Sequence, residues 1–279
     1  MRSFESLQNE LLSFISQFES CAVAMSAGVD STVVAKAAHL ALCENSIAVT
    51  ATSASLASGE LDDARRIAAE IGIVHRVVET NEFDNPLYVQ NSKDRCYHCK
   101  TELYSQLDGL SESLDVQAVF NGTNTDDLGD YRPGLKAASE HSVVSPLAEC
   151  GMNKRDVRVL AEGWDLPTWD KPASPCLSSR IAYGEEVTPE RLQMVDQAEQ
   201  WLKENGFVNL RVRYHGGDIA RIEVPADEVA KVASDELRVP LVTYLKEIGF
   251  KFVSLDLSGF ESGSLNQLVN IEVASQIDH

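Results

Sequence analysis

The chain has few basic side chains: 24 Lys and Arg stand against 43 Asp and Glu among 279 residues, a formal net charge of −19. A strongly acidic surface repels polyanions, which disfavours a nucleic-acid substrate unless a local basic patch overrides the field. No apolar run reaches the roughly 18–20 residues that span a bilayer, so no membrane partner is expected. Residues 1–5 begin an amphipathic helix rather than the apolar core of a signal peptide, and we expect a cytoplasmic protein.

Two common nucleotide-binding motifs are also missing, the Walker pattern and the dinucleotide fingerprint G-x-G-x-x-G. Their absence disfavours kinase-like proteins and Rossmann oxidoreductases. There is no internal repeat and no low-complexity tract. The length suffices for one large domain or two modest ones, and 44% hydrophobic residues are typical of a globular protein.

Six cysteines are present, and in a reducing compartment they are expected to be thiols or metal ligands rather than disulfides. Cys21 begins an apolar run, Cys43 ends a helical pattern and Cys150 lies in a turn. We interpret these three as buried or incidental thiols.

Short apolar runs alternate with helical patterns through the first 150 residues. Such alternation is typical of an α/β fold, a parallel sheet with helices on both faces. Strands are predicted over 21–25, 47–52, 75–79, 116–120 and 143–144, and helices over 4–18, 32–42, 59–71 and 100–114.

The pattern changes in a proline-rich stretch. We predict a first domain over 1–168, a linker over 169–187 and a smaller α+β domain over 188–279. That last domain should contain a helix over 189–205 and strands over 210–214, 219–224 and 250–257.

The loop from Ser26 to Ser31, Ser-Ala-Gly-Val-Asp-Ser, lies where the first predicted strand gives way to a helix. Backbone N–H groups at a helix N-terminus bind phosphate, and Gly28 permits a close approach. Ser26 and Ser31 offer hydroxyl donors, and Asp30 suits a helix cap or a magnesium ion. An ordinary capped strand-to-helix turn explains the same spacing, so the residues alone leave both interpretations open.

The loop resembles the S-G-G-x-D-S motif of the PP-loop ATP pyrophosphatases, with Ala27 in place of the usual second-position Gly. In that family ATP is split between its α and β phosphates, and an adenylated acceptor then reacts with a nucleophile. Three further blocks, over 121–134, 171–184 and 211–223, closely resemble the LarE sulfurtransferases, and the similarity covers nearly the whole chain.

This resemblance implies the substrate pyridinium-3,5-biscarboxylic acid mononucleotide, whose carboxylates become thiocarboxylates for the nickel-pincer nucleotide cofactor. It implies ATP and Mg²⁺ as cofactors, hydrosulfide as sulfur source and a homo-oligomer, a hexamer. The ATP-binding residues expected from the loop and from the chain after the fourth strand are Ser26, Ala27, Gly28, Asp30, Ser31, Gly122, Asp126 and Arg132, with Asp30 near the magnesium. Asp126 and the neighbouring Asp127 otherwise only cap the next turn.

Cys96 and Cys99 form a C-x-x-C at the start of a predicted helix, and Cys176 lies in the proline-rich segment. By spacing alone the pair is a redox pair, part of a zinc site or two bystanders. In LarE-like proteins three such cysteines hold a 4Fe–4S cluster, whose open iron carries hydrosulfide. In another subtype the cysteine matching Cys176 gives up its own sulfur and becomes dehydroalanine.

Arg211 and Arg213 are two residues apart on a predicted strand and therefore face the same side. Two guanidinium groups on one face suit a phosphate or carboxylate ligand, although a solvated strand face is an equal alternative. The resemblance assigns Arg211, Arg213 and Ser179, with Arg180 as a further candidate, to a substrate phosphate. It places Glu199 and Glu223 in the same pocket as possible metal ligands.

Two other classes of protein fit part of the pattern. A tRNA thiolase uses the same loop, but the net charge and the lack of a zinc-knuckle pair disfavour it. A nucleotide-binding module without catalysis would not explain the Cys-x-Ser-Ser-Arg segment at Cys176 or the strand that carries Arg211 and Arg213.

Overall fold

The computed structural model describes residues 2–128, 133–172, 174–261 and 265. The chain divides into two compact units. The first consists of Met1–Ser53, Gly59–Glu82 and Cys96–Ser174, and the second of Ala54–Ser58, Phe83–Arg95 and Pro175–His279. Two short segments of the N-terminal half therefore belong to the second unit. The predicted division into a domain over 1–168, a linker over 169–187 and a smaller domain over 188–279 stays a prediction.

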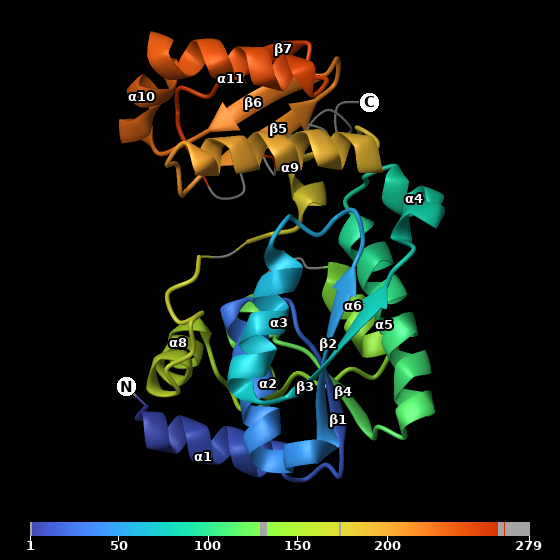
Figure 1. Cartoon of the computed structure of the whole chain (residues 1–279). Coiled ribbons are helices and arrows are strands. Elements are labelled where there is room, and N and C mark those ends of the chain that lie inside the picture. Colours follow the sequence, from blue (N-terminus) through green and yellow to red (C-terminus); the bar gives the residue numbers. More distant parts are fainter. Residues whose placement is uncertain (1, 129–132, 173, 262–264, 266–279) are drawn as a thin grey trace, which may run out of the picture. The chain divides into compact units, whose positions relative to one another are not determined.

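A four-stranded parallel sheet in the order β3-β2-β1-β4 forms the centre of the first unit (Figure 1). Its strands are β1 (Cys21–Ala24), β2 (Ser46–Thr52), β3 (Val74–Glu79) and β4 (Ala118–Phe120). The α/β fold class predicted from the alternating pattern is confirmed. Because the strands are parallel, the loops that follow their carboxyl ends gather at one edge of the sheet, where ligands bind in such folds.

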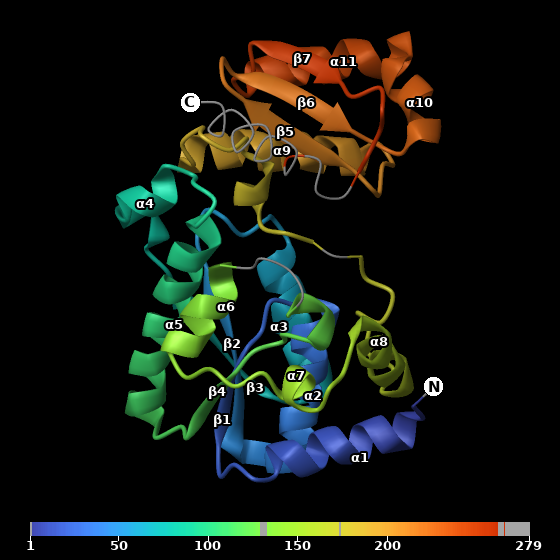
Figure 2. The same cartoon turned by 180° about the vertical axis from the view of Figure 1, so that it is seen from behind.

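Helices cover both faces of this sheet (Figures 1 and 2). In β1, Cys21 and Val23 face one helix layer and Ala22 faces the other, as the alternation along a strand requires. The first layer is formed by α1 (Phe4–Ile15), α2 (Val29–Leu42), α3 (Glu60–Ile71), α7 (Pro146–Glu149) and α8 (Lys154–Gly163), and the second by α5 (Arg95–Leu114) and α6 (Pro133–Glu140). Among the residues described, no helix combines the length and apolar character needed to cross a membrane.

The strand predicted at 143–144 is wrong. Val144 forms only an isolated parallel bridge to Phe120, with its N–H donating to the carbonyl of Val119 at 2.9 Å. Pro146, which begins α7, has no N–H to continue a ladder, so the pairing ends at once.

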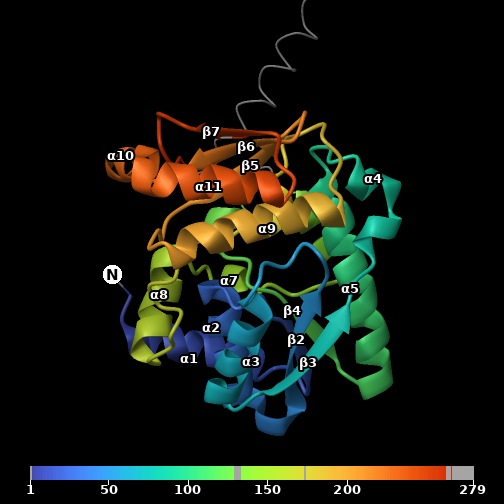
Figure 3. The ribbon, with the colours of Figure 1, turned by 45° about the horizontal axis from the view of Figure 1, so that its top comes forward.

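The second unit contains a three-stranded sheet in the order β5-β6-β7, with β5 and β6 antiparallel and β6 and β7 parallel. Helices α9 and α11 pack side by side against it, and Trp201 stacks on Tyr244 between them (Figure 3). The elements are α4 (Pro86–Val89), α9 (Pro189–Glu204), β5 (Arg211–His215), β6 (Ile219–Glu223), α10 (Val229–Ala233), α11 (Asp235–Glu247) and β7 (Phe252–Leu255). Short 3-10 turns lie at Cys43–Asn45, Glu82–Asp84, Thr125–Asp127, Leu177–Arg180 and Ala226–Glu228.

Candidate functional site

The loop between β1 and α2 is closed by its two serines. The backbone N–H of Ser26 donates to Oγ of Ser31 at 3.1 Å, and that hydroxyl donates in turn to the carbonyl of Gly28 at 3.2 Å. Gly28 is the N-cap of α2 and supplies no side-chain cap. The partial positive charge of the first helical turn is therefore not neutralised by a capping side chain, which suits a bound anion.

Ala27 has a left-handed backbone conformation, with φ of 56°, and is fully buried. A residue with a β-carbon is disfavoured there by about 1–2 kcal/mol, whereas glycine adopts this region freely. The loop thus retains the backbone conformation that the usual second-position glycine permits.

Gly122 allows the chain after β4 to touch the first turn of α2. A β-carbon on Gly122 would lie 2.7 Å from the backbone nitrogen of Ser31 and 3.0 Å from the carbonyl carbon of Asp30. Two residues further on, Nδ2 of Asn124 donates to Oδ1 of Asp30 at 2.9 Å. The loop after β4 and the loop after β1 therefore pack against each other.

Asp30 carries its charge in a partly buried position. Desolvation raises the pKa of its carboxyl and nearby Asp127 adds to the rise, while the hydrogen bond from Asn124 lowers it. A carboxylate that is costly to leave buried without a counter-ion gains most from a bound cation, which is consistent with the expected place of magnesium.

The acidic residues that follow Gly122 act as helix caps. Asp126 accepts the backbone N–H of Lys154, the first residue of α8, at 2.9 Å. Asp127 and Asn124 form a reciprocal capping box over Thr125–Asp127. Asp126 and Asp127 therefore make the capping contacts that the sequence offered as the alternative to ATP binding. Arg132, predicted as an ATP-binding residue, lies outside the described residues.

Lys171 contacts the loop between β1 and α2, which the sequence did not predict. Its Nζ donates to the carbonyl oxygen of Ala27 at 3.3 Å and to Oδ2 of Asp63 in α3 at 3.2 Å. The contact joins residues 144 positions apart. Only the position of Lys171 in one of the family-like blocks could have drawn attention to it.

The three cysteines assigned to sulfur chemistry belong to different units. Cys96, which is exposed, and Cys99, which is half-buried, lie at the start of α5 in the first unit. Cys176 is exposed and precedes the 3-10 turn Leu177–Arg180 in the second unit. Within the described ranges, no group of three or more His, Cys, Asp or Glu side chains is placed to hold a metal ion.

The remaining cysteines have the surroundings predicted for them. Cys21 is buried in β1, and burial raises the pKa of its thiol to about 12. Burial likewise raises the pKa of Cys150. Cys43 is exposed at the C-terminal end of α2.

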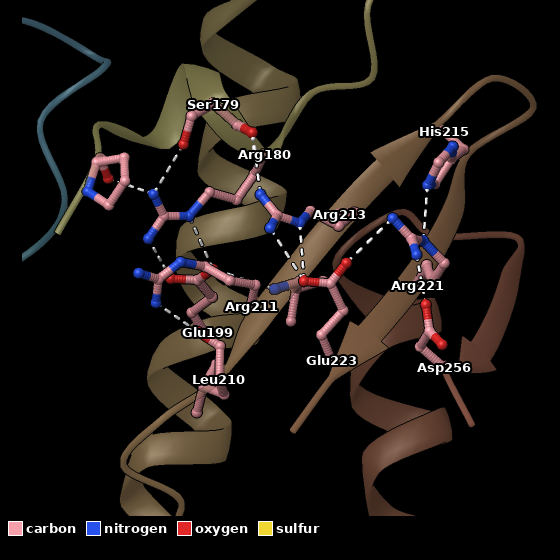
Figure 4. Close-up of polar contacts among 12 residues, drawn as sticks. Ser179, Arg180, Glu199, Leu210, Arg211, Arg213, His215, Arg221, Glu223 and Asp256 are labelled. Atoms are coloured by element: carbon pink, nitrogen blue, oxygen red, sulfur yellow. Dashed lines mark hydrogen bonds and ion pairs between the residues drawn. The ribbon is translucent and has the colours of Figure 1, made fainter. Parts of the chain in front are cut away.

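Arg180 and Glu199 form a buried ion pair close in sequence to Cys176 (Figure 4). Nε and Nη2 of Arg180 donate to the two oxygens of Glu199 at 3.0 and 3.3 Å. Nη1 is directed at the carbonyls of Pro175 and Cys176 and at Oγ of Ser179. The guanidinium proposed from sequence as a phosphate ligand therefore binds the backbone that carries Cys176.

A second network joins β5 and β6 (Figure 4). Arg213 donates through Nε and Nη2 to Oε2 of Glu223, at 3.1 and 3.0 Å, and through Nη1 to the carbonyl of Ser179. The other oxygen of Glu223 lies 3.1 Å from Nη2 of Arg221, which also pairs with Asp256. Glu199 and Glu223, predicted as possible metal ligands, thus contact arginines.

Arg211 lies beside both networks, on the same side of β5 as Arg213 (Figure 4). Burial and the neighbouring Arg180 lower the pKa of its guanidinium. Among the described residues, four arginines share this region with three carboxylates. The four are Arg180, Arg211, Arg213 and Arg221, and the three are Glu199, Glu223 and Asp256. In a protein of net charge −19, this grouping of guanidinium groups suits an anionic ligand.

Residues of α4 and of the chain after it form hydrogen bonds to the 3-10 turn Leu177–Arg180 and to Ala182, just after it. The hydroxyl of Tyr88 lies 2.7 Å from Oγ of Ser178, and Nη1 of Arg95 donates to the carbonyl of Ser178 at 2.8 Å. Asn91, fully buried, donates to the carbonyl of Ala182 at 2.8 Å. The segment with Cys176 and Ser179 is fixed by a buried polar network that the sequence did not indicate.

Comparison with known proteins gives several relatives over most of the chain, although no family model matches it. A pyridinium-3,5-bisthiocarboxylic acid mononucleotide synthase of Lactiplantibacillus plantarum is 37% identical over 92% of each chain. An uncharacterized protein of Synechocystis sp. is 45% identical over 95% of this chain and 98% of its own. A subunit of the glutamine-hydrolyzing GMP synthase of Archaeoglobus fulgidus is 27% identical over 65% of this chain and 63% of its own.

The parallel sheet, the serine-closed loop at the N-terminus of α2 and the packing of Gly122 on that turn define an α/β protein consistent with the PP-loop superfamily. The identity with the Lactiplantibacillus plantarum enzyme extends over both units. The chain belongs to the family of pyridinium-3,5-bisthiocarboxylic acid mononucleotide synthase, the LarE family.

Proposed function

We propose that this protein is an ATP-dependent sulfurtransferase. It would convert carboxylates of pyridinium-3,5-biscarboxylic acid mononucleotide to thiocarboxylates for the nickel-pincer nucleotide cofactor. The observation that carries the proposal is the 37% identity over 92% of each chain with a pyridinium-3,5-bisthiocarboxylic acid mononucleotide synthase. The packed loops after β1 and β4 support it, because they combine phosphate-binding N–H groups with an acidic side chain.

The first half-reaction is adenylation of the substrate. A carboxylate oxygen attacks the α-phosphorus of ATP, the bond to the β-phosphate oxygen breaks, and pyrophosphate leaves. Ser26 to Ser31 would bind the phosphates through the first turn of α2, and Asp30 would hold Mg²⁺ beside them. The raised pKa of Asp30 and its hydrogen bond from Asn124 support this role, since they describe a partly buried, oriented carboxylate.

The substrate phosphate would bind in the second unit. Arg211 and Ser179 would contact it, and Arg213 would contribute its charge from the pair with Glu223. The grouping of four arginines in the second unit supports this site, since guanidinium groups bind phosphate well. Arg180 would act indirectly, by fixing the backbone of Cys176 and Ser179.

The second half-reaction needs a sulfur nucleophile that attacks the acyl carbon and expels AMP. Cys96, Cys99 and Cys176 would hold a 4Fe–4S cluster, which when bound supplies sulfide without consuming the protein. The residue types support this proposal: none of the three cysteines forms a disulfide among the described residues, and Cys96 and Cys99 are three residues apart at the start of α5. The hexamer and the use of free hydrosulfide stay predictions from the resemblance.

Anaerobic purification tests the proposal with Cys96→Ala and, as a matched control for loss of one exposed thiol, Cys43→Ala. We expect about four iron atoms per chain in the wild type and the control, as a 4Fe–4S cluster requires, and loss of iron in Cys96→Ala. Pyrophosphate should be released when ATP and the biscarboxylic substrate are both present. Lack of substrate-dependent pyrophosphate release would contradict the function itself.

Intact mass separates the two sources of sulfur. If the wild-type chain lacks iron and becomes lighter by the mass of one hydrogen sulfide after its single turnover, sulfur is donated by Cys176 itself. That result would contradict the cluster. An unchanged mass after many turnovers would support the cluster.

A further inference from the structure

Lys171 is held on the nucleotide loop by two oxygen acceptors. Its Nζ donates to the carbonyl of Ala27 at 3.3 Å and to Oδ2 of Asp63 at 3.2 Å. An ammonium group has three N–H donors, and in the part of the chain that the structure describes the third has no acceptor. About a quarter of the side chain is exposed (26%), so a ligand at the loop can reach the group.

The two contacts hold the ammonium only weakly. The Asp63 side chain is 40% exposed, and ion pairs open to solvent contribute little. Asp63 is also paired with Arg66 at 2.9 Å. Its pKa is lowered because the hydrogen bonds from Arg66 and Lys171 outweigh the effect of burial. Asp63 therefore keeps a cationic partner when Lys171 turns away.

The backbone of Lys171, in contrast, is fixed. Its N–H donates to the carbonyl of Thr168 at 3.1 Å, and its own carbonyl accepts Nη2 of Arg158 in α8 at 3.3 Å. A second nitrogen of Arg158 donates to the carbonyl of Trp169 at 2.5 Å. A flexible four-carbon side chain on a fixed backbone can change acceptors without moving the segment.

We propose that Lys171 is a phosphate-contacting residue of the nucleotide site. Its ammonium leaves the carbonyl of Ala27 for the triphosphate of ATP at the first turn of α2, and it then stabilises the negative charge on the departing pyrophosphate. A phosphate oxygen is a stronger acceptor for an ammonium than a neutral carbonyl is. This inference rests on the proposed use of ATP and adds a cation to a loop whose own residues, Ser26 to Ser31, include none.

The affinities for pyrophosphate, ATP and adenosine test the proposal in Lys171→Gln and Lys171→Arg. Lys136→Gln is the matched control, because it makes the same charge change on an exposed lysine of the same unit. We expect Lys171→Gln to weaken binding of pyrophosphate and ATP by about 10- to 100-fold, as expected for loss of a charged hydrogen bond. Adenosine binding should stay unchanged, and Lys171→Arg should restore part of the loss.

A merely structural role would reduce adenosine and ATP binding alike and would overturn the proposal, as would an ATP affinity within twofold of the wild type. If the wild type itself binds no ATP, the proposed function fails before this inference is reached.

Acetylation of the wild-type protein gives a measurement that does not depend on folding of a variant. With pyrophosphate bound, acetylation of Lys171 followed by mass spectrometry should slow at least about tenfold, since its ammonium is engaged, while Lys136 reacts as before. Equal rates at Lys171 with and without bound pyrophosphate would contradict the contact.

Discussion

Arg180 and Glu199 form a bidentate ion pair in which both side chains are 3% exposed. Oε1 of Glu199 also accepts the backbone N–H of Val212 at 3.1 Å. The pair thus links α9, strand β5 and the turn that follows Cys176. A buried pair of this kind is costly to break, because the surviving charge has no water to compensate it.

Replacing Glu199 by alanine should therefore lower the stability of the protein strongly. We expect a loss of about 3–5 kcal/mol in the free energy of unfolding, measured by urea titration, because Arg180 remains buried and uncompensated. Asp235→Ala, which breaks an exposed pair with Arg238, should cost less than about 1 kcal/mol.

The same variant separates the two interpretations of Glu199. If the carboxylate held a metal, EDTA would destabilise the wild type about as much as the substitution does. If it positions Arg180, EDTA should leave the melting temperature unchanged. A cost below about 1 kcal/mol for Glu199→Ala would contradict both the pair and the metal.

Gly122→Ala should damage the proposed nucleotide site where the chain after β4 packs most closely on α2. The added carbon would meet backbone atoms of Ser31 and Asp30 at 2.7 and 3.0 Å, so the chain after β4 must move away from α2. We expect a loss of about 1–3 kcal/mol in stability. ATP affinity should fall at least about tenfold, which equals 1.4 kcal/mol.

Gly109→Ala in α5 is the matched control, since nothing lies within 4 Å of its added carbon. It should stabilise the protein by about 0.5–1 kcal/mol through helix propensity. Equal behaviour of the two variants would show that Gly122 is not a packing contact.

Asp30→Asn should raise stability at neutral pH while abolishing ATP turnover. The folded-state pKa of Asp30 is raised above its ordinary 3.8 by desolvation, so between the two values the folded protein binds more protons than the unfolded chain. Its stability falls as the pH rises through this window and stays reduced above it. The neutral asparagine avoids this loss and keeps an oxygen for the bond from Asn124.

Melting temperatures of Asp30→Asn and the wild type should therefore differ most near pH 7 and converge below pH 3.8. Asp235→Asn, at an exposed acid, should show no such gain. A variant less stable than the wild type at pH 7 would mean that the charge of Asp30 stabilises the fold.

The sheet could be predicted from sequence because its strands are short apolar runs between polar loops. β1 and β2 have almost the predicted bounds. The strand at 143–144 failed because pairing also depends on the residues after the run, and Pro146 ends it. Local composition identifies an apolar run but does not show over how many residues that run pairs with a neighbouring strand.

The loop at Ser26–Ser31 was predictable because its parts are contiguous in the chain. The positive φ of Ala27 explains why glycine is usual at this position. The sequence resemblance shows that alanine replaces glycine there but does not show the backbone conformation. Lys171 could not be placed on this loop, because 144 residues separate it from Ala27. Nor could sequence tell which arginines have buried carboxylate partners: Arg180 and Arg213 do, through tertiary packing.

Tyr88, Asn91 and Arg95 belong to the second unit but lie in the segment Phe83–Arg95, far in sequence from its main part, Pro175–His279. A gene fragment encoding only Pro175–His279 would omit all three, so Ser178 would lose the hydroxyl of Tyr88 beside it. During synthesis these three residues leave the ribosome long before their partners exist. The second unit therefore keeps this network only when residues 83–95 are included, a segment that lies between two parts of the first unit in the sequence.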